Sequence, residues 1–175
     1  MFYAVDLTAC SSNLVINGST VKHGPNIKEA DPMEVAFLTP PNINIERQSI
    51  SVRVLRGCSG NIIVGFGYMT EFTHDYDKLD IIPSIMYSFL NGESYHAYDS
   101  NIVEVGKMSH RNDNPILTLV YDATAGTLHG AYDLEPAVLL LSKIPLTYPL
   151  IRPFVALCEI DDVIMVVPNP RQDFP

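Results

Sequence analysis

Residues 117–133 read LTLVYDATAGTLHGAYD, two alternating runs of residues on either side of the pair Ala125-Gly126. Successive side chains of a β-strand point to opposite faces, so every second residue of each run shares a face. The apolar face of the first run comprises Leu117, Leu119 and Tyr121. The residues expected across from them are Thr127, His129 and Ala131. The stretch therefore predicts an antiparallel hairpin whose apolar face fills a core.

Alternation of the same kind recurs along the chain, whereas helical periodicity is scarce. Asn17-Gly18 is a preferred hairpin turn, and the apolar run 137–141 is too short to be assigned as a helix. The expected strands are 13–16, 19–21, 33–38, 50–55, 61–68, 84–89, 94–98, 102–105, 154–158 and 163–167. Short strands at a spacing of roughly 8–12 residues are typical of an antiparallel β-sandwich or barrel. We expect an all-β fold with little or no helix.

Composition limits the domain organisation and the partners. The 175 residues fit a single domain, expected over residues 1–167 with a C-terminal tail at 168–175. The net charge of −9 disfavours binding to nucleic acid or to an anionic membrane surface. No run approaches 18 apolar residues, and the first residues lack the features of a signal peptide. Three cysteines without a close pair indicate reduced thiols, so we expect an intracellular, cytoplasmic protein.

Four stretches, taken in order, resemble the SPRY domain family. They are SVRVLRGCSGNIIVGFGY (51–68), SIMYSFLNGESYHAYDS (84–100), NPILTLVYDATAGTLHGAYD (114–133) and LIRPFVALCEIDDVIMVV (150–167). The third carries the most specific part, Tyr121-Asp122 followed by Ala125-Gly126-Thr127. The chain has no Trp, which the family usually carries, so the resemblance is to a divergent member. The Neuralized homology repeat, another β-sandwich of similar size, is the alternative family.

The resemblance implies a two-layer antiparallel sandwich of the concanavalin-type jelly roll and a non-catalytic adaptor. SPRY domains bind a short segment or surface of another protein through loops at one end, often recruit substrates to ubiquitin ligases, and need no cofactor. Transferred to this sequence, the binding end is expected to include two turns and the loop after strand 61–68. The candidate partner-binding residues are Gly57, Ser59, Asn61, Tyr76, Asp77, Tyr98, Glu159 and Asp161. An acidic rim there favours a basic or amide-rich partner segment.

The loop THDYDKLD at 73–80 has three interpretations. Its carboxylates, Asp75, Asp77 and Asp80, could bind Ca²⁺, but the Gly and the helical flanks of an EF-hand are missing. It could instead be a solvated acidic loop, or a partner-binding loop in which Tyr76 is the anchor. The aromatic cluster of Tyr87, Tyr95, His96 and Tyr98 is expected mostly in the core, with one member at the mouth of the binding end.

No motif indicates catalysis or a metal site. The five histidines have neither HExxH nor HxH spacing, and the sequence contains neither a P-loop nor a G-x-S-x-G motif. We therefore expect no enzymatic activity, no cofactor and no metal, and a monomeric domain with a protein or peptide partner. Two other functions stay open: a lectin-like sandwich that binds glycan, and a structural subunit of a larger complex. The absence of Trp weakens the glycan alternative, since glycan sites favour an exposed stacking aromatic residue.

Overall fold

The hairpin at 117–133 is formed by β10 (Ile116–Asp122) and β11 (Thr127–Tyr132), as the alternation predicts. Its register differs from the expected one, because Leu119 pairs with Gly130 and Tyr121 pairs with Leu128. The residues expected across from the apolar face were therefore wrong: Thr127, His129 and Ala131 pair with Asp122, Val120 and Thr118 and lie on the other face. The reason is the loop, which spans Ala123 to Gly126 instead of two residues.

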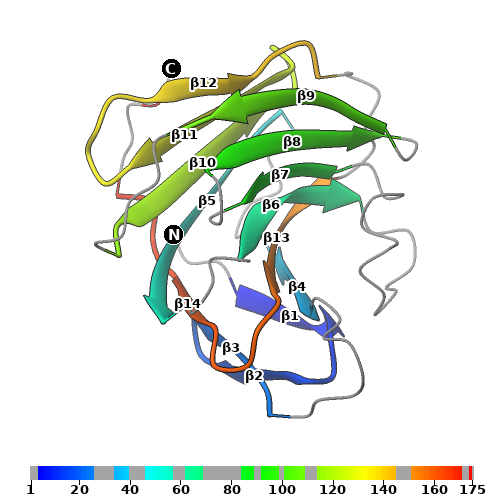
Figure 1. Cartoon of the computed structure of the whole chain (residues 1–175), viewed down its shortest axis with the longest axis vertical. Helices are drawn as coiled ribbons and strands as arrows, with labels where there is room; N and C mark the ends of the chain where they lie inside the picture. Colours follow the sequence, from blue (N-terminus) through cyan, green and yellow to red (C-terminus); the bar gives the residue numbers. More distant parts are fainter. Residues whose placement is uncertain are drawn as a thin grey trace.

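The computed structural model describes residues 4–25, 34–39, 46–56, 62–68, 84–88, 92–98, 101–108, 114–144, 151–170 and 174. Within these ranges the chain forms fourteen strands in two antiparallel sheets of seven strands each, and none of these residues is helical (Figure 1). No helix that could cross a membrane occurs in the described part of the chain. The all-β, two-layer sandwich predicted from the sequence is confirmed.

Sheet A combines the N-terminal strand with strands from the middle and the end of the sequence. Its spatial order is β1 (Ala4–Cys10), β4 (Glu34–Thr39), β13 (Ile151–Leu157), β6 (Ile63–Tyr68), β7 (Ser84–Ser88), β8 (Glu93–Tyr98) and β9 (Asn101–Lys107). β1 was not predicted. It is an edge strand with an irregular register between Val5 and Cys10, and its exposed Leu7 interrupts the alternation that marks a half-buried strand.

Sheet B contains the hairpin. Its spatial order is β12 (Val138–Leu141), β11, β10, β5 (Arg47–Arg56), β14 (Val163–Val166), β3 (Thr20–His23) and β2 (Leu14–Asn17). The short apolar run that periodicity could not assign is thus the edge strand β12. The β2–β3 turn consists of Gly18 and Ser19, one residue later than expected, since Asn17 pairs with Thr20 and Gly18 has a φ of 60°.

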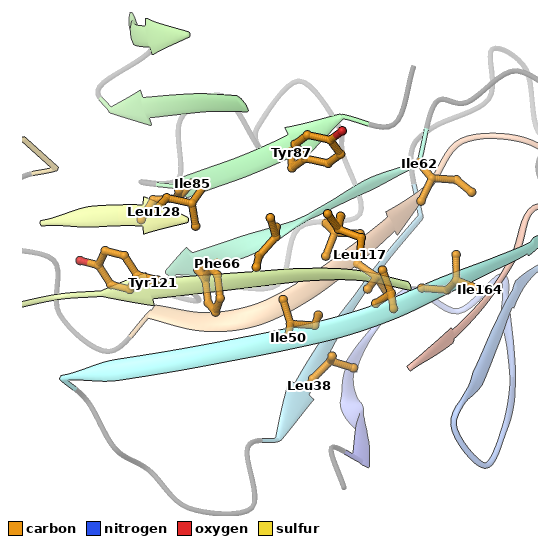
Figure 2. Close-up of a cluster of buried hydrophobic side chains, with 14 of the residues drawn as sticks. Leu38, Ile50, Ile62, Phe66, Ile85, Tyr87, Leu117, Tyr121, Leu128 and Ile164 are labelled. Atoms are coloured by element: carbon orange, nitrogen blue, oxygen red, sulfur yellow. The ribbon is translucent and has the colours of Figure 1, made fainter. Parts of the chain in front are cut away.

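The core lies between the inner faces of the two sheets (Figure 2). Phe66 of sheet A and Tyr121 of sheet B meet with ring centroids 5.8 Å apart. The hydroxyls of Tyr87 (β7) and Tyr132 (β11) share a hydrogen bond of 2.6 Å across the core. A buried hydroxyl without a hydrogen-bond partner destabilises the folded chain, and this bond gives each of the two hydroxyls a partner. The expected core roles of Leu117, Leu119, Tyr121 and Tyr87 are confirmed, since each is at most 1% exposed.

β13 begins three residues earlier than predicted and contains Pro153 inside the sheet. Proline lacks an N–H, so a central strand normally avoids it. Leu38 lies one position beyond the Phe154–Phe37 pair, opposite Pro153, and its carbonyl accepts a 3.3 Å hydrogen bond from the Arg152 guanidinium. A side chain thus supplies a donor where the backbone has none, and this compensation is not visible in the sequence.

Candidate functional site

The strand ends that bracket two connections between the sheets lie at the same end of the sandwich. Residues 158–162 join β13 to β14, and residues 57–62 join β5 to β6. Register brings their strand ends together, because Arg56 pairs with Val163 in sheet B and Ala156 pairs with Ile63 in sheet A. We refer to this end, defined by the turn 158–162, as the Asp161 end.

The turn at the Asp161 end is organised by a buried carboxylate. Asp162 is 0% exposed, and its Oδ2 accepts a 3.1 Å hydrogen bond from the N–H of Glu159. The Asp162 N–H donates in return to the Glu159 carbonyl at 3.0 Å. The Asp162 carbonyl accepts the N–H of His23 at 3.0 Å, which ties the turn to β3. Rigid backbone contacts therefore fix the positions of Glu159 and Asp161.

Asp161 forms the charged centre of this end. With a φ of 74°, it occupies the left-handed region that Asp tolerates better than most residues. Its carboxylate lies 3.0 Å from Lys22 Nζ and 3.5 Å from Arg56 Nη2. Lys22 and Arg56 both pair with Val163, one from each side of β14, so the two cations flank the turn. The hydrogen bond from Lys22, and then the charge of Arg56, lower the pKa of the Asp161 carboxyl below its ordinary value.

These ion pairs change the expected charge of the rim. The carboxylate predicted to attract a basic segment is already paired with two cations within the chain. The Arg56 side chain is 64% exposed and that of Lys22 is 44% exposed, so a partner would meet both cations as well as Asp161. The described part of this rim is therefore of mixed charge, and the expected acidic rim is corrected accordingly.

His23 lies beneath the turn and is 2% exposed. Its Nδ1 is 2.8 Å from the Gly24 carbonyl, whereas its Nε2 has no hydrogen-bond partner. Among the residues that the structure describes, no three His, Cys, Asp or Glu side chains gather as they would around a metal ion. His23 is therefore a packing residue of the Asp161 end, held by its backbone bond to Asp162.

The predicted site residues divide between the two ends of the sandwich. Glu159 and Asp161 lie at the Asp161 end. Gly57, Ser59 and Asn61 are outside the described residues, but Arg56 and Ile62, which bracket them, lie at this end too. The structure thus brings the strand ends of both predicted turns together.

For the remaining candidates, the nearest described strand ends lie at the opposite end. Tyr76 and Asp77, with the acidic loop 73–80, are outside the described residues; Tyr68 and Ser84, the strand ends that bracket them, lie at the far ends of β6 and β7. Tyr98 ends β8 and pairs with Asn101 at that same opposite end. The strand topology therefore does not favour the expectation that all eight residues share one end.

Sequence reasoning missed Lys22 and Arg56. Each lies one residue beyond the end of a predicted strand, 19–21 or 50–55, where a charged side chain is ordinarily just solvated. Only the strand order β3–β14–β5 places them on either side of Val163 and next to Asp161. The sequence signal, a cation directly after each predicted strand, was present but not specific.

The fold is that of SPRY domains. No protein-family model and no curated protein matches the sequence. The SPRY domain of human HERC1 superposes with a TM-score of 0.70 at 16% identity, over 96% of this chain and 99% of that one. The TRIM65 PSpry domain gives 0.67 at 13% identity, over 97% and 91%, and a human SPRY domain gives 0.61 at 13% identity, over 89% and 94%. At such identities the likeness establishes the divergent SPRY-like sandwich and leaves function to be argued from the site.

Proposed function

We propose that this chain is a non-catalytic protein–protein interaction module, an adaptor whose binding surface lies at the Asp161 end. The fold supports an interaction module, since the structures it resembles are SPRY domains. The observation that carries the location is the Lys22–Asp161–Arg56 cluster, which lies at a rigid turn beside the strand ends that bracket the second connection. A rigid scaffold with loops at one end binds a partner without a large ordering cost.

The proposed partner is a protein segment rich in amide and carbonyl groups. A rim of mixed charge offers donors from Lys22 and Arg56 and an acceptor from Asp161, so it can satisfy the amides of an extended segment. Recruitment of a substrate to a ubiquitin ligase is the adaptor role that the SPRY resemblance favours. We propose that the module acts as a monomer inside the cell.

The test is capture of partners from lysate of the source cells by purified chains, read by mass spectrometry. The variant Arg56→Ala/Asp161→Ala removes the centre of the rim. Lys143→Gln is the control, because Lys143 is an exposed cation beside the β10–β11 loop, at the opposite end of the sandwich. A partner should be retained by wild type and by Lys143→Gln and lost from the double variant. If every partner is retained by a folded double variant, the proposed location is wrong.

Tyr76→Ala/Asp77→Ala forms a second, separate arm of the same experiment. These residues were predicted as anchors, yet they belong to the connection that starts at the opposite end. Loss of the partner from this variant alone would move the binding surface to the opposite end. Loss from both variants would mean that the partner contacts the two ends.

One observation favours the alternative of a structural subunit. Leu134, Val138 and Leu139 are 77%, 42% and 53% exposed and lie on β12 or just before it, at the edge of sheet B. Exposed apolar side chains on an edge strand are typical of assembly surfaces. Light scattering distinguishes the two functions, since a subunit that assembles through β12 would associate, and Leu139→Lys would return it to a monomer.

A further inference from the structure

The strands around β14 differ in charge from the rest of the chain. β2, β3, β14 and β5 together contain four cations and no acidic residue; the cations are Lys22, Arg47, Arg53 and Arg56. The chain as a whole has a net charge of −9. Positive charge is therefore concentrated on these four strands of an otherwise acidic protein.

Two of the cations point away from the core on alternation alone. Both neighbours of Lys22 on β3 are buried, and both neighbours of Arg53 on β5 pack into the core. Successive side chains of a strand point to opposite faces, so Lys22 and Arg53 point outward. Arg53 is exposed to solvent.

A β-bulge adds Arg56 to the same face. Arg56 pairs with Val163 and Val54 pairs with Ile164, so Leu55 is an extra residue in β5. The extra residue shifts the alternation that would otherwise turn Arg56 toward the core. Leu55 is 41% exposed and the Arg56 side chain is 64% exposed. The bulge thus presents an aliphatic side chain and a guanidinium next to each other.

Partly exposed apolar side chains lie between the cations. Val163 and Met165 are the outward residues of β14, since the two residues that alternate with them are buried. Met165 pairs with Arg53, and Val163 lies between Lys22 and Arg56. We refer to this surface as the cationic face; it comprises Lys22, Arg53, Leu55, Arg56, Val163 and Met165.

The carboxylates around the cationic face leave it with excess positive charge. Lys22 and Arg56 share a single carboxylate, that of Asp161. Arg53 forms no ion pair with any residue that the structure describes. The Oδ1 of Asp133, at the neighbouring end of β10, accepts the N–H of the first residue of that strand at 3.0 Å. Three cations and one ion-paired carboxylate leave an excess of two positive charges.

We propose that the cationic face binds an acidic segment of the partner protein, with carboxylates at the three cations and an aliphatic side chain on Val163 and Met165. This inference rests on the proposed function, because it places the partner next to the Asp161 end and adds carboxylates to the amide groups proposed there. It also extends the binding surface from the turn onto the outer face of sheet B.

Charge complementarity favours a short acidic segment over a long polyanion. Exposed charges interact over about 10 Å at 0.1 M salt, so a short segment meets the local positive charge. Nucleic acid or an anionic membrane would extend beyond this face and meet the net charge of −9. The partner chemistry that fits is therefore a protein segment with a few Asp or Glu residues.

The test compares two peptides with blocked termini that differ only in charge, Gly-Glu-Ser-Leu-Ser-Glu-Gly and Gly-Gln-Ser-Leu-Ser-Gln-Gly. Alternate residues of an extended segment share a face, so the Glu and Leu side chains lie together. Binding is followed at low salt through the amide NMR signals of the isotope-labelled chain. We expect shifts at Arg53, Leu55 and Met165, and a Kd for the Glu peptide about three- to tenfold lower than for the Gln peptide. Added salt should remove this difference.

Three exposed or partly exposed positions locate the site. Arg53→Gln should bring the Kd of the Glu peptide close to that of the Gln peptide, whereas Lys143→Gln, at the opposite end of the sandwich, should leave it unchanged. Met165→Gln should weaken binding of both peptides, since both carry Leu. Thermal unfolding checks that each variant is folded. Equal binding of the two peptides by wild type, or binding of the Glu peptide that Arg53→Gln leaves unchanged, would overturn the proposal.

Capture from lysate separates a failure of this inference from a failure of the proposed function. A partner that Arg53→Gln retains and Arg56→Ala/Asp161→Ala loses would overturn the cationic face and leave the adaptor surface at the Asp161 end. Peptide binding that depends on Arg53, together with capture that does not depend on Arg56 and Asp161, would support the cationic face and overturn the proposed location.

Discussion

Single residues fix the two turns on which the account depends, and they do so through backbone conformation. Gly126 closes the β10–β11 loop with a φ of 63°, and Asp161 stands at 74° in the proposed binding turn. Glycine has no Cβ and adopts this region freely, whereas Asp adopts it at a cost that its surroundings must offset. The Asp162 hydrogen bonds within the same turn provide such surroundings.

Gly126→Val should destabilise the chain. A β-branched residue at a positive φ is strained by roughly 1–3 kcal/mol, and the loop also supplies the carbonyl that Ile144 binds. The measurement is the free energy of unfolding by urea, with Ala125→Val as the control in the same exposed loop. Equal stability of the two variants would show that the turn does not need a positive φ at Gly126.

The pKa of Asp161 should respond to the loss of either cation. Lys22 and Arg56 favour the charged carboxylate, so Lys22→Met should raise the pKa of Asp161 toward its ordinary value, and Arg56→Met should do so less. Carboxyl-carbon NMR titration of the three chains measures this directly. A pKa that both substitutions leave in place would mean that the cluster does not persist in solution.

At the scale of elements, the sequence predicts strands well wherever one face is buried. β14 alternates in burial, β10 and β11 place every second residue in the core, and all three were found within about a residue of their ends. β1 and β12 were missed or left unassigned because both are edge strands with exposed apolar residues. The register of the hairpin could not be predicted from the sequence either, because loop length sets it. The loop is longer than the expected pair Ala125-Gly126, so Thr127, His129 and Ala131 lie on the other face.

The edges of the two sheets meet where β9 passes β12. A Cβ built on Gly106 of β9 would overlap the Leu140 carbonyl oxygen of β12, so only glycine allows this approach. Gly106→Ala should therefore push the backbones of β9 and β12 apart and lower the free energy of unfolding by roughly 1–3 kcal/mol.

Gly67→Ala is the matched control for Gly106→Ala. Its Cβ would meet only the rings of Phe154 and Phe37, at 3.2 Å or more, and side chains shift more readily than backbone. We expect a smaller loss of stability in thermal and urea unfolding. A Gly106→Ala chain as stable as wild type would mean that β9 and β12 are not in contact.

At the scale of the whole molecule, topology decides which candidate residues can act together. Resemblance to SPRY domains predicted the sandwich and the two turns that meet at the Asp161 end. It could not show that the strand ends bracketing Tyr76 and Asp77 lie at the opposite end, because that follows from the direction of β6. Nor could composition show that the chain continues along β5 after β14, or that Phe174 packs against Val120 and Ala131.

Hydrogen–deuterium exchange with the captured partner bound tests the central claim most directly. Slower exchange should appear in peptides covering residues 20–24 and 158–163, which contain Lys22, His23 and Asp161. The β10–β11 loop at the opposite end, residues 123–126, and residues 167–170, which follow β14 along β5, should exchange as in the free chain. Protection confined to 123–126 and 142–144, with none at 158–163, would contradict a binding surface at the Asp161 end.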